Sequence, residues 1–189
     1  MEGLFVHAFS DAGVMAGNGT IALEILEDLP DVDAVITPYG GGGLTCGVAA
    51  AFRHFKPDTH LYAAEAEVAT PVTSSLAAGK SVEVPYTPSF IDGIGAPFLF
   101  EEMWEFARQL LDGSTVSTLA EVIAAVKLLA VGNRIVAEGA GATPVAAALS
   151  AAKQGVDLAD ALHLFRTPED ADFATFDRAL AKSARRLRT

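Results

Sequence analysis

The sequence has little cysteine, little positive charge and no long apolar segment, and each shortage excludes a class of protein. Cys46 is the single cysteine among 189 residues, so neither an internal disulfide nor a cysteine-based metal cluster can form. The 13 lysine and arginine residues face 24 acidic ones, which gives a net charge of −11 and argues against nucleic-acid or membrane partners. No apolar run is long enough to span a bilayer, and no signal-peptide pattern is visible. We therefore expect a cytoplasmic protein, and its 51% hydrophobic content allows one domain with a substantial core.

Four consecutive glycines, Gly40 to Gly43, are the most informative local pattern. They follow a strand-like run, residues 34–39, and precede an alanine-rich, helix-like run, residues 44–55. Glycines allow backbone N–H groups to approach an anion closely, and a helix N-terminus adds partial positive charge. A simple turn does not need four glycines, because each costs conformational entropy on folding. The pattern therefore predicts an anion site that suits a phosphate.

Short apolar runs alternate with amphipathic runs along most of the chain. Strands are expected at residues 4–8, 31–38, 60–64 and 115–117, and helices at residues 17–29, 44–55, 70–78, 100–111 and 119–132. A long irregular stretch lies between Pro85 and Pro97, and a small-residue loop at 138–142 is expected to lead into a helix ending near Lys153. This alternation predicts an α/β fold of three layers, with a mostly parallel sheet between helices on both faces.

The region after Gly155 has a different, more charged character. Residues 157–165 and 168–188 are expected to form two helices, and no further buried strand is expected there. The sequence therefore predicts an α/β unit over residues 1–155 and a divergent helical tail over residues 156–189.

Six sequence phrases carry a resemblance to a known family. They are HAFSD at 7–11, AGNGTIALEI at 16–25, GGGGL at 40–44, AAE at 63–65, FIDGI at 90–94 and VAEGAGA at 136–142. In this order they resemble the fold-type II pyridoxal-phosphate (PLP) enzymes, specifically the serine/threonine dehydratases (threonine ammonia-lyases) and serine racemase. The resemblance runs from about residue 5 to residue 152, so residues 1–155 would be the PLP-binding part of the large domain.

The resemblance also implies roles for individual residues. The PLP phosphate would be held by the backbone N–H groups of Gly40, Gly41, Gly42, Gly43 and Leu44. Gly93 would lie beside the cofactor ring and Glu138 near the pyridine ring. The implied reaction is α,β-elimination from serine or threonine, giving a 2-oxo acid and ammonia, with PLP as the electron sink.

Two departures from the family pattern predict that the chain is inactive on its own. The family's cofactor-anchoring lysine lies early in the chain, in a Ser-x-Lys-type motif, and no lysine here lies in such a motif; the five are Lys56, Lys80, Lys127, Lys153 and Lys182. A PLP enzyme needs such a buried amine as aldehyde anchor and proton shuttle. The family also ends in a strand reading roughly Ser-Gly-Gly-Asn, which the sequence after Gly155 does not contain. We therefore expect an N-terminally truncated dehydratase chain without a catalytic residue of its own.

Other function classes stay open at this point. One is a non-catalytic module that binds a phosphorylated ligand or a partner chain, and another is a decayed gene product. The choice between serine and threonine and between dehydratase and racemase is also open. The family commonly forms dimers, so a homodimer is one assembly to consider.

Four further patterns have simpler interpretations. Residues 77–81 lack the first glycine of a nucleotide P-loop, since position 74 is serine, so a helix C-cap followed by a turn is favoured. Residues 17–22 are not followed by the acidic residue that a dinucleotide fingerprint requires. Glu65 matches a glutamate that binds a divalent cation in some relatives, but Pro71 stands where their second carboxylate is expected, so no metal is predicted. Cys46 lies where a helix N-terminus could lower its pKa, although a buried apolar role is favoured.

Overall fold

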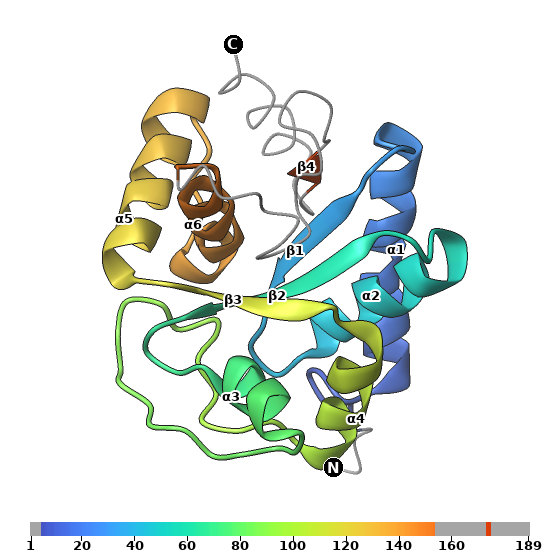
Figure 1. The fold of residues 1–189 in the computed structure, drawn as a ribbon. Helices are drawn as coiled ribbons and strands as arrows, with labels where there is room; N and C mark the ends of the chain where they lie inside the picture. Colours follow the sequence, from blue (N-terminus) through green and yellow to red (C-terminus); the bar gives the residue numbers. More distant parts are fainter. Residues whose placement is uncertain (1–4, 154–172, 175–189) are drawn as a thin grey trace.

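The computed structural model describes residues 5–153 and 173–174, and a parallel sheet lies at its centre (Figure 1). The strands in this part of the chain are β1 (Ala34–Pro38), β2 (His60–Ala66), β3 (Gly113–Ser117) and β4 (Phe173–Ala174), in the order β3-β2-β1-β4. Each neighbouring pair is parallel, and the register places Ala34 opposite His60 and Tyr62 opposite Gly113.

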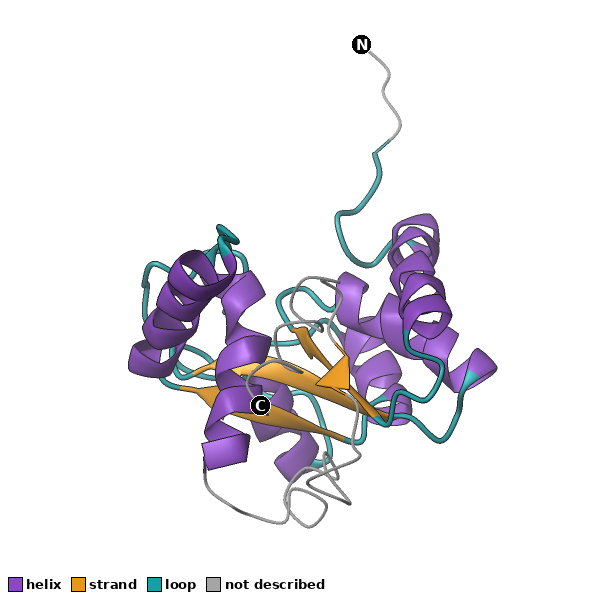
Figure 2. Ribbon diagram, turned by 90° about the horizontal axis from the view of Figure 1, so that it is seen from above, coloured by secondary structure: helices purple, strands orange, loops and turns teal. Residues whose placement is uncertain are grey.

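Helices cover both faces of this sheet, as the view from above shows (Figure 2). One face carries α1 (Ala12–Asp28) and α2 (Gly43–Phe55), and the other carries α5 (Leu119–Leu128), its continuation η1 (Leu129–Asn133) and α6 (Gly139–Lys153). The two remaining helices, α3 (Pro71–Ala78) and α4 (Glu101–Leu110), contact β3 and α2 respectively. None of the helices described has both the length and the apolar character needed to cross a bilayer. The three-layer α/β architecture predicted from the sequence is confirmed.

The central strands are buried on both sides, which explains their continuous apolar sequences. Successive strand side chains point to opposite faces of a sheet. Val35 and Leu61 pack with residues of α1 and α2, whereas Ile36 and Tyr62 pack with Ala151 of α6. Because every residue of β1 is buried, this strand shows no polar alternation, as expected for a parallel sheet covered on both faces.

The first helix begins at Ala12, earlier than the predicted Gly17. The Asp11 side chain accepts hydrogen bonds from the N–H groups of Gly13 at 2.8 Å and Val14 at 3.1 Å, and so forms the N-cap. A glycine inside a helix costs about 1 kcal/mol relative to alanine, so the glycines at 13 and 17 weaken the helical pattern at this end of α1. The aspartate at position 11 was the signal that could have found it.

The small-residue loop expected at residues 138–142 is a second correction. Residues 139–142 form the first turn of α6 instead. The Glu138 carboxylate accepts a hydrogen bond from the Gly141 N–H at 3.2 Å, and the Glu138 carbonyl accepts one from Ala142 at 3.1 Å. This capping allows the helix to begin directly after the glutamate, in spite of its glycines.

The strand expected at residues 4–8 is wrong over residues 5–8, which form neither strand nor helix. The Nδ1 atom of His7 accepts hydrogen bonds from the N–H groups of Phe9 at 3.5 Å and Ser10 at 3.3 Å, so the chain turns here. Phe5 is 83% exposed, which shows that no sheet face buries this segment. Leu4 lies outside the described residues.

The predicted tail contains one described element. Strand β4 pairs in parallel with β1 through Ala34 and Phe173, so the helix expected over residues 168–188 does not run through residues 173–174. A strand therefore lies in the region for which no further buried strand was expected. The rest of residues 154–189, with the helix expected at 157–165, lies outside the described residues. The boundary between residues 155 and 156 stays a prediction.

Candidate functional site

The glycine loop, Gly40–Gly43, leads from β1 into α2 at the carboxyl end of the sheet. Open parallel sheets bind ligands in the crevice outside the carboxyl ends of their strands. Gly42 is the N-cap of α2 and adopts φ 95° and ψ −15°, a left-handed conformation that favours glycine. The predicted anion site therefore lies where this class of fold places its ligands.

The donors of this loop are free for a ligand. Within the described residues, the backbone N–H groups of Gly40 to Leu44 donate no hydrogen bond. The first turn of α2 contains no acidic side chain, and Gly40, Gly41 and Leu44 are partly exposed. Unpaired N–H groups at a helix N-terminus attract an anion through hydrogen bonds and the helix dipole. The loop therefore fits a phosphate group.

Gly93 lies between the other two predicted parts of the site, Gly40 and Glu138. A Cβ atom on Gly40 would lie 2.8 Å from the carbonyl oxygen of Gly93, and a Cβ on Gly93 would lie 3.1 Å from Oε1 of Glu138. Gly93 belongs to the irregular segment before α4, whereas Glu138 immediately precedes α6. The fold thus brings Gly40, Gly93 and Glu138 together from three distant segments. Their roles toward a cofactor stay predictions.

Two buried isoleucines hold Gly93 in this place. Ile91 is fully buried and Ile94 nearly so, and both pack in the core between α5 and α6. Gly93 itself is exposed. The irregular segment is therefore anchored on both sides of Gly93, which lets its backbone come against the glycine loop without any regular secondary structure.

Phe9 packs on the other side of the glycine loop. A Cβ on Gly41 would overlap the Phe9 ring, and a Cβ on Gly43 would lie 2.6 Å from the Phe9 carbonyl oxygen. Neither contact follows from the sequence, because a local pattern does not show which distant side chain packs on a loop. Two of the four glycines are therefore required by Phe9, independently of any ligand.

Tyr39 and Cys46 are buried beneath the loop. The Tyr39 hydroxyl approaches the Cys46 thiol without hydrogen-bond geometry and has no partner within the described residues. Burial raises the pKa of Tyr39 and raises the pKa of Cys46 to about 12. A buried thiol with a raised pKa carries little thiolate, so Cys46 fits the buried apolar role favoured by the sequence.

The described lysines lie away from the glycine loop or on the surface. Lys56 is the C-cap of α2, and its Nζ donates to the Pro30 carbonyl at 2.8 Å. This position is about 20 Å from the glycine loop, given the rise of a helix of this length. Lys80 and Lys127 are exposed. Lys182 and the Lys153 side chain lie outside what the structure describes. No described lysine is therefore placed as a buried amine beside the loop.

Glu65, considered above as a metal ligand, instead closes the N-terminus of α3. It is 1% exposed, and its carboxylate accepts hydrogen bonds from the N–H groups of Val72 at 2.7 Å and Thr73 at 2.9 Å and from the Thr73 hydroxyl at 2.6 Å. Among the described residues, no three histidine, cysteine or acidic side chains gather as a metal site would. The carboxylate therefore serves the fold by satisfying helix donors.

The buried position of Glu65 predicts a pH-dependent contribution to stability. Burial raises the pKa of Glu65 above its ordinary value of 4.5, against the lowering effect of its hydrogen bonds with Thr73 and Val72. The folded state then binds the proton more readily than the unfolded state, so this contribution is present below pH 4.5 and is lost as the pH rises through the raised pKa. We expect Glu65→Gln to remove this pH-dependent loss of stability, because glutamine does not ionise. Above pH 4.5 the free energy of unfolding of the variant should therefore change less with pH than that of the wild type.

Urea unfolding at a series of pH values measures this difference. Glu67→Gln is the matched control, because it makes the same exchange at an exposed carboxylate two residues further on. The same pH dependence for Glu65→Gln and wild type would contradict the prediction.

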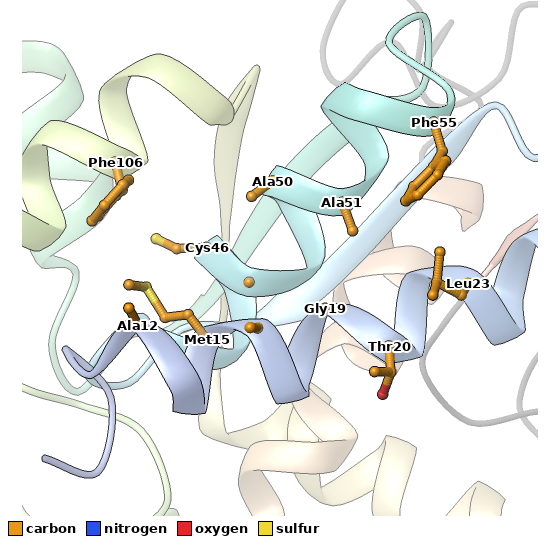
Figure 3. A pocket seen from close by; sticks show the side chains of 12 residues that line it. Ala12, Met15, Gly19, Thr20, Leu23, Cys46, Ala50, Ala51, Phe55 and Phe106 are labelled. Atoms are coloured by element: carbon orange, nitrogen blue, oxygen red, sulfur yellow. The ribbon is translucent and has the colours of Figure 1, made fainter. Parts of the chain in front are cut away.

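A separate hollow of about 380 Å³ lies between α1 and α2, with Phe106 of α4 at one end (Figure 3). The two helices approach closely here, since a Cβ on Gly19 would lie 3.1 Å from the carbonyl oxygen of Gly47. Leu23 and Phe55 form its other end. The lining contains no charged side chain, so this hollow is not a candidate for phosphate binding.

Comparison with known proteins identifies the family of this chain. Residues 1–161 match the family described as pyridoxal-phosphate dependent enzyme. The chain is 40% identical over 147 residues to L-threonine ammonia-lyase of Geobacter sulfurreducens, covering 78% of this chain and 37% of that protein. It is 37% identical over 147 residues to serine racemase of Oryza sativa subsp. indica, covering 78% and 43%.

Solved structures give the same result. Maize serine racemase has a TM-score of 0.79 and 31% identity over 90% of this chain and 49% of that chain. The T.th. threonine deaminase has a TM-score of 0.74 and 32% identity over 79% and 52%. The chain thus spans about half, or less, of the length of these relatives. The resemblance to the fold-type II serine/threonine dehydratases and serine racemase is confirmed, and the chain belongs to the pyridoxal-phosphate dependent enzyme family.

Proposed function

We propose that this chain provides the phosphate-binding part of a PLP-dependent enzyme that acts on serine or threonine. The observation that carries the proposal is the glycine loop, whose N–H groups from Gly40 to Leu44 are unpaired within the described residues at the N-terminus of α2. Relatives named threonine ammonia-lyase and serine racemase support these two amino acids as the substrate class.

Each part of the site has its own proposed role in binding the cofactor. The N–H groups of the glycine loop would hold the phosphate of PLP. Gly93 carries no side chain where the ring would lie, and Glu138 adds an exposed carboxylate at the same place. When bound, PLP supplies an electron sink for elimination from a β-hydroxy amino acid. The chain's own part is to bind and orient the cofactor.

We further propose that the chain alone does not release ammonia from serine or threonine. The reaction needs a lysine amine at the cofactor aldehyde. Lys56 lies at the far end of α2, and Lys80 and Lys127 are exposed. Because none of the lysines whose side chains are described lies as a buried amine beside the glycine loop, the chain should bind PLP reversibly.

Titration of the purified protein with PLP, followed by absorbance and equilibrium dialysis, tests both proposals. We expect saturable binding that inorganic phosphate displaces, no single lysine that borohydride labels in proportion to this binding, and no 2-oxobutyrate from threonine. Pyridoxal, which lacks the phosphate, is the matched control and should bind far more weakly. Binding that phosphate fails to displace would contradict the role of the glycine loop. Production of 2-oxobutyrate would contradict the proposed inactivity.

A further inference from the structure

We propose that Phe9 is a positioning residue that clamps the glycine loop in the conformation that binds phosphate. This inference rests on the proposed function. The Phe9 ring occupies the space beside Gly41, where a Cβ atom would lie 2.6 Å from Cε1 of the ring. The backbone of Phe9 covers Gly43, where a Cβ would lie 2.6 Å from both Cα and the carbonyl oxygen of Phe9. One residue therefore contacts two of the four glycines.

Hydrogen bonds fasten the chain on both sides of Phe9. On one side, Nδ1 of His7 accepts from the N–H groups of Phe9 and Ser10. On the other side, Asp11 accepts from the N–H groups of Gly13 and Val14 and joins the segment to α1. Phe9 is therefore held by its own segment as well as by the loop on which it packs.

Neighbouring aromatic rings fix the Phe9 side chain. The centroid of the His7 ring lies 4.4 Å from that of Phe9, with the planes at 86°, and the Phe100 centroid lies 5.3 Å away. Edge-to-face and tilted contacts at these distances are favourable. Phe100 in turn immediately precedes α4, so the ring of Phe9 is tied to the body of the fold.

A clamp of this kind increases affinity by removing a conformational cost. Four successive glycines can adopt many backbone conformations, and an anion would have to select one of them at an entropic cost. A loop already held in one conformation loses less entropy when the ligand binds. The Phe9 contacts hold Gly41 and Gly43 in place before any ligand binds. Phe9 can therefore increase the affinity for the ligand without contacting it.

Replacement of Phe9 tests the clamp. We expect Phe9→Ala to weaken PLP binding about tenfold, Phe9→Leu to restore most of the affinity by refilling the space on Gly41, and both variants to remain folded. Phe98→Ala is the matched control, because Phe98 is an exposed phenylalanine that also contacts Phe100, with centroids 5.3 Å apart. Its PLP affinity should equal that of the wild type.

Backbone ¹⁵N relaxation without ligand provides the second measurement, because its order parameters report the mobility of the loop directly. The order parameters of Gly41 and Gly43 should fall in Phe9→Ala, whereas those of the β1 core should not change. Wild-type binding with unchanged affinity in Phe9→Ala would overturn the clamp and leave the proposed function intact. If the wild type itself fails to bind PLP, the proposed function fails, and equal order parameters of Gly41 and Gly43 in wild type and Phe9→Ala would then overturn the clamp as well.

Discussion

Replacement of Glu65 by alanine is expected to lower the free energy of unfolding by about 3 kcal/mol. The substitution removes the acceptor of three hydrogen bonds, from the N–H groups of Val72 and Thr73 and from the Thr73 hydroxyl. Because Glu65 is almost fully buried, water cannot replace the lost acceptor without entering the core, and the donors of α3 stay unsatisfied. Urea-induced unfolding followed by circular dichroism measures the loss.

The variant Glu67→Ala tests whether the large loss of stability in Glu65→Ala comes from burial of the carboxylate or from loss of a helix cap. Glu67 lies two residues further on, is exposed, and caps α5 by accepting from the Leu119 N–H at 2.7 Å. Loss of an exposed cap of this kind costs about 1 kcal/mol. Equal losses in free energy of unfolding for Glu65→Ala and Glu67→Ala would show that the buried hydrogen bonds at α3 stabilise the fold no more than an exposed cap does.

Gly42→Ala is expected to weaken PLP binding about a hundredfold, because strain of about 1–3 kcal/mol lowers the fraction of protein with a binding-competent loop. The residue adopts φ 95°, which side chains rarely tolerate. A Cβ there would also lie 2.5 Å from the Tyr39 hydroxyl and 2.9 Å from Cε of Met103. Both neighbours belong to a buried cluster, so the glycine loop must move. Equilibrium dialysis with PLP measures the affinity.

Gly79→Ala is the matched control for this substitution. Gly79 ends α3 with φ 68°, and a Cβ there would meet no atom within 4 Å. The same kind of backbone strain, without a clash, costs about 1 kcal/mol and should leave PLP binding unchanged. PLP affinity in Gly42→Ala equal to that in Gly79→Ala would argue against the glycine loop as the phosphate site.

Most of the fold could be predicted from the sequence because its elements carry local signals. The apolar run of β1, the glycine that ends α3 and the helix-forming run of α2 each appear where the pattern indicates. The early start of α1 was missed because its glycines opposed the capping signal of Asp11. Strand β4 was missed because two residues are too short to show a period.

The candidate site was only partly predictable, for a physical reason. The glycine loop and its position between a strand and a helix follow from local sequence, and the family resemblance added Gly93 and Glu138. The packing of Phe9 on Gly41, however, is a tertiary contact between segments with no shared pattern. The role of Glu65 also depends on which helix N-terminus reaches its carboxylate, and sequence spacing alone does not determine that.

The two-sided support of the glycine loop has a consequence for the order of folding. Gly41 touches Phe9 and Gly40 touches Gly93, so the loop takes its final shape only when both remote segments have arrived. Contacts between residues far apart in sequence must overcome the entropy of closing long loops, and they form later than local ones. The pairing of β1 with β2 across α2 closes a shorter stretch of chain than the contact between Gly40 and Gly93, so we expect it to form first. An anion that recognises the finished loop should therefore act after the main folding barrier, by slowing unfolding and not by speeding folding.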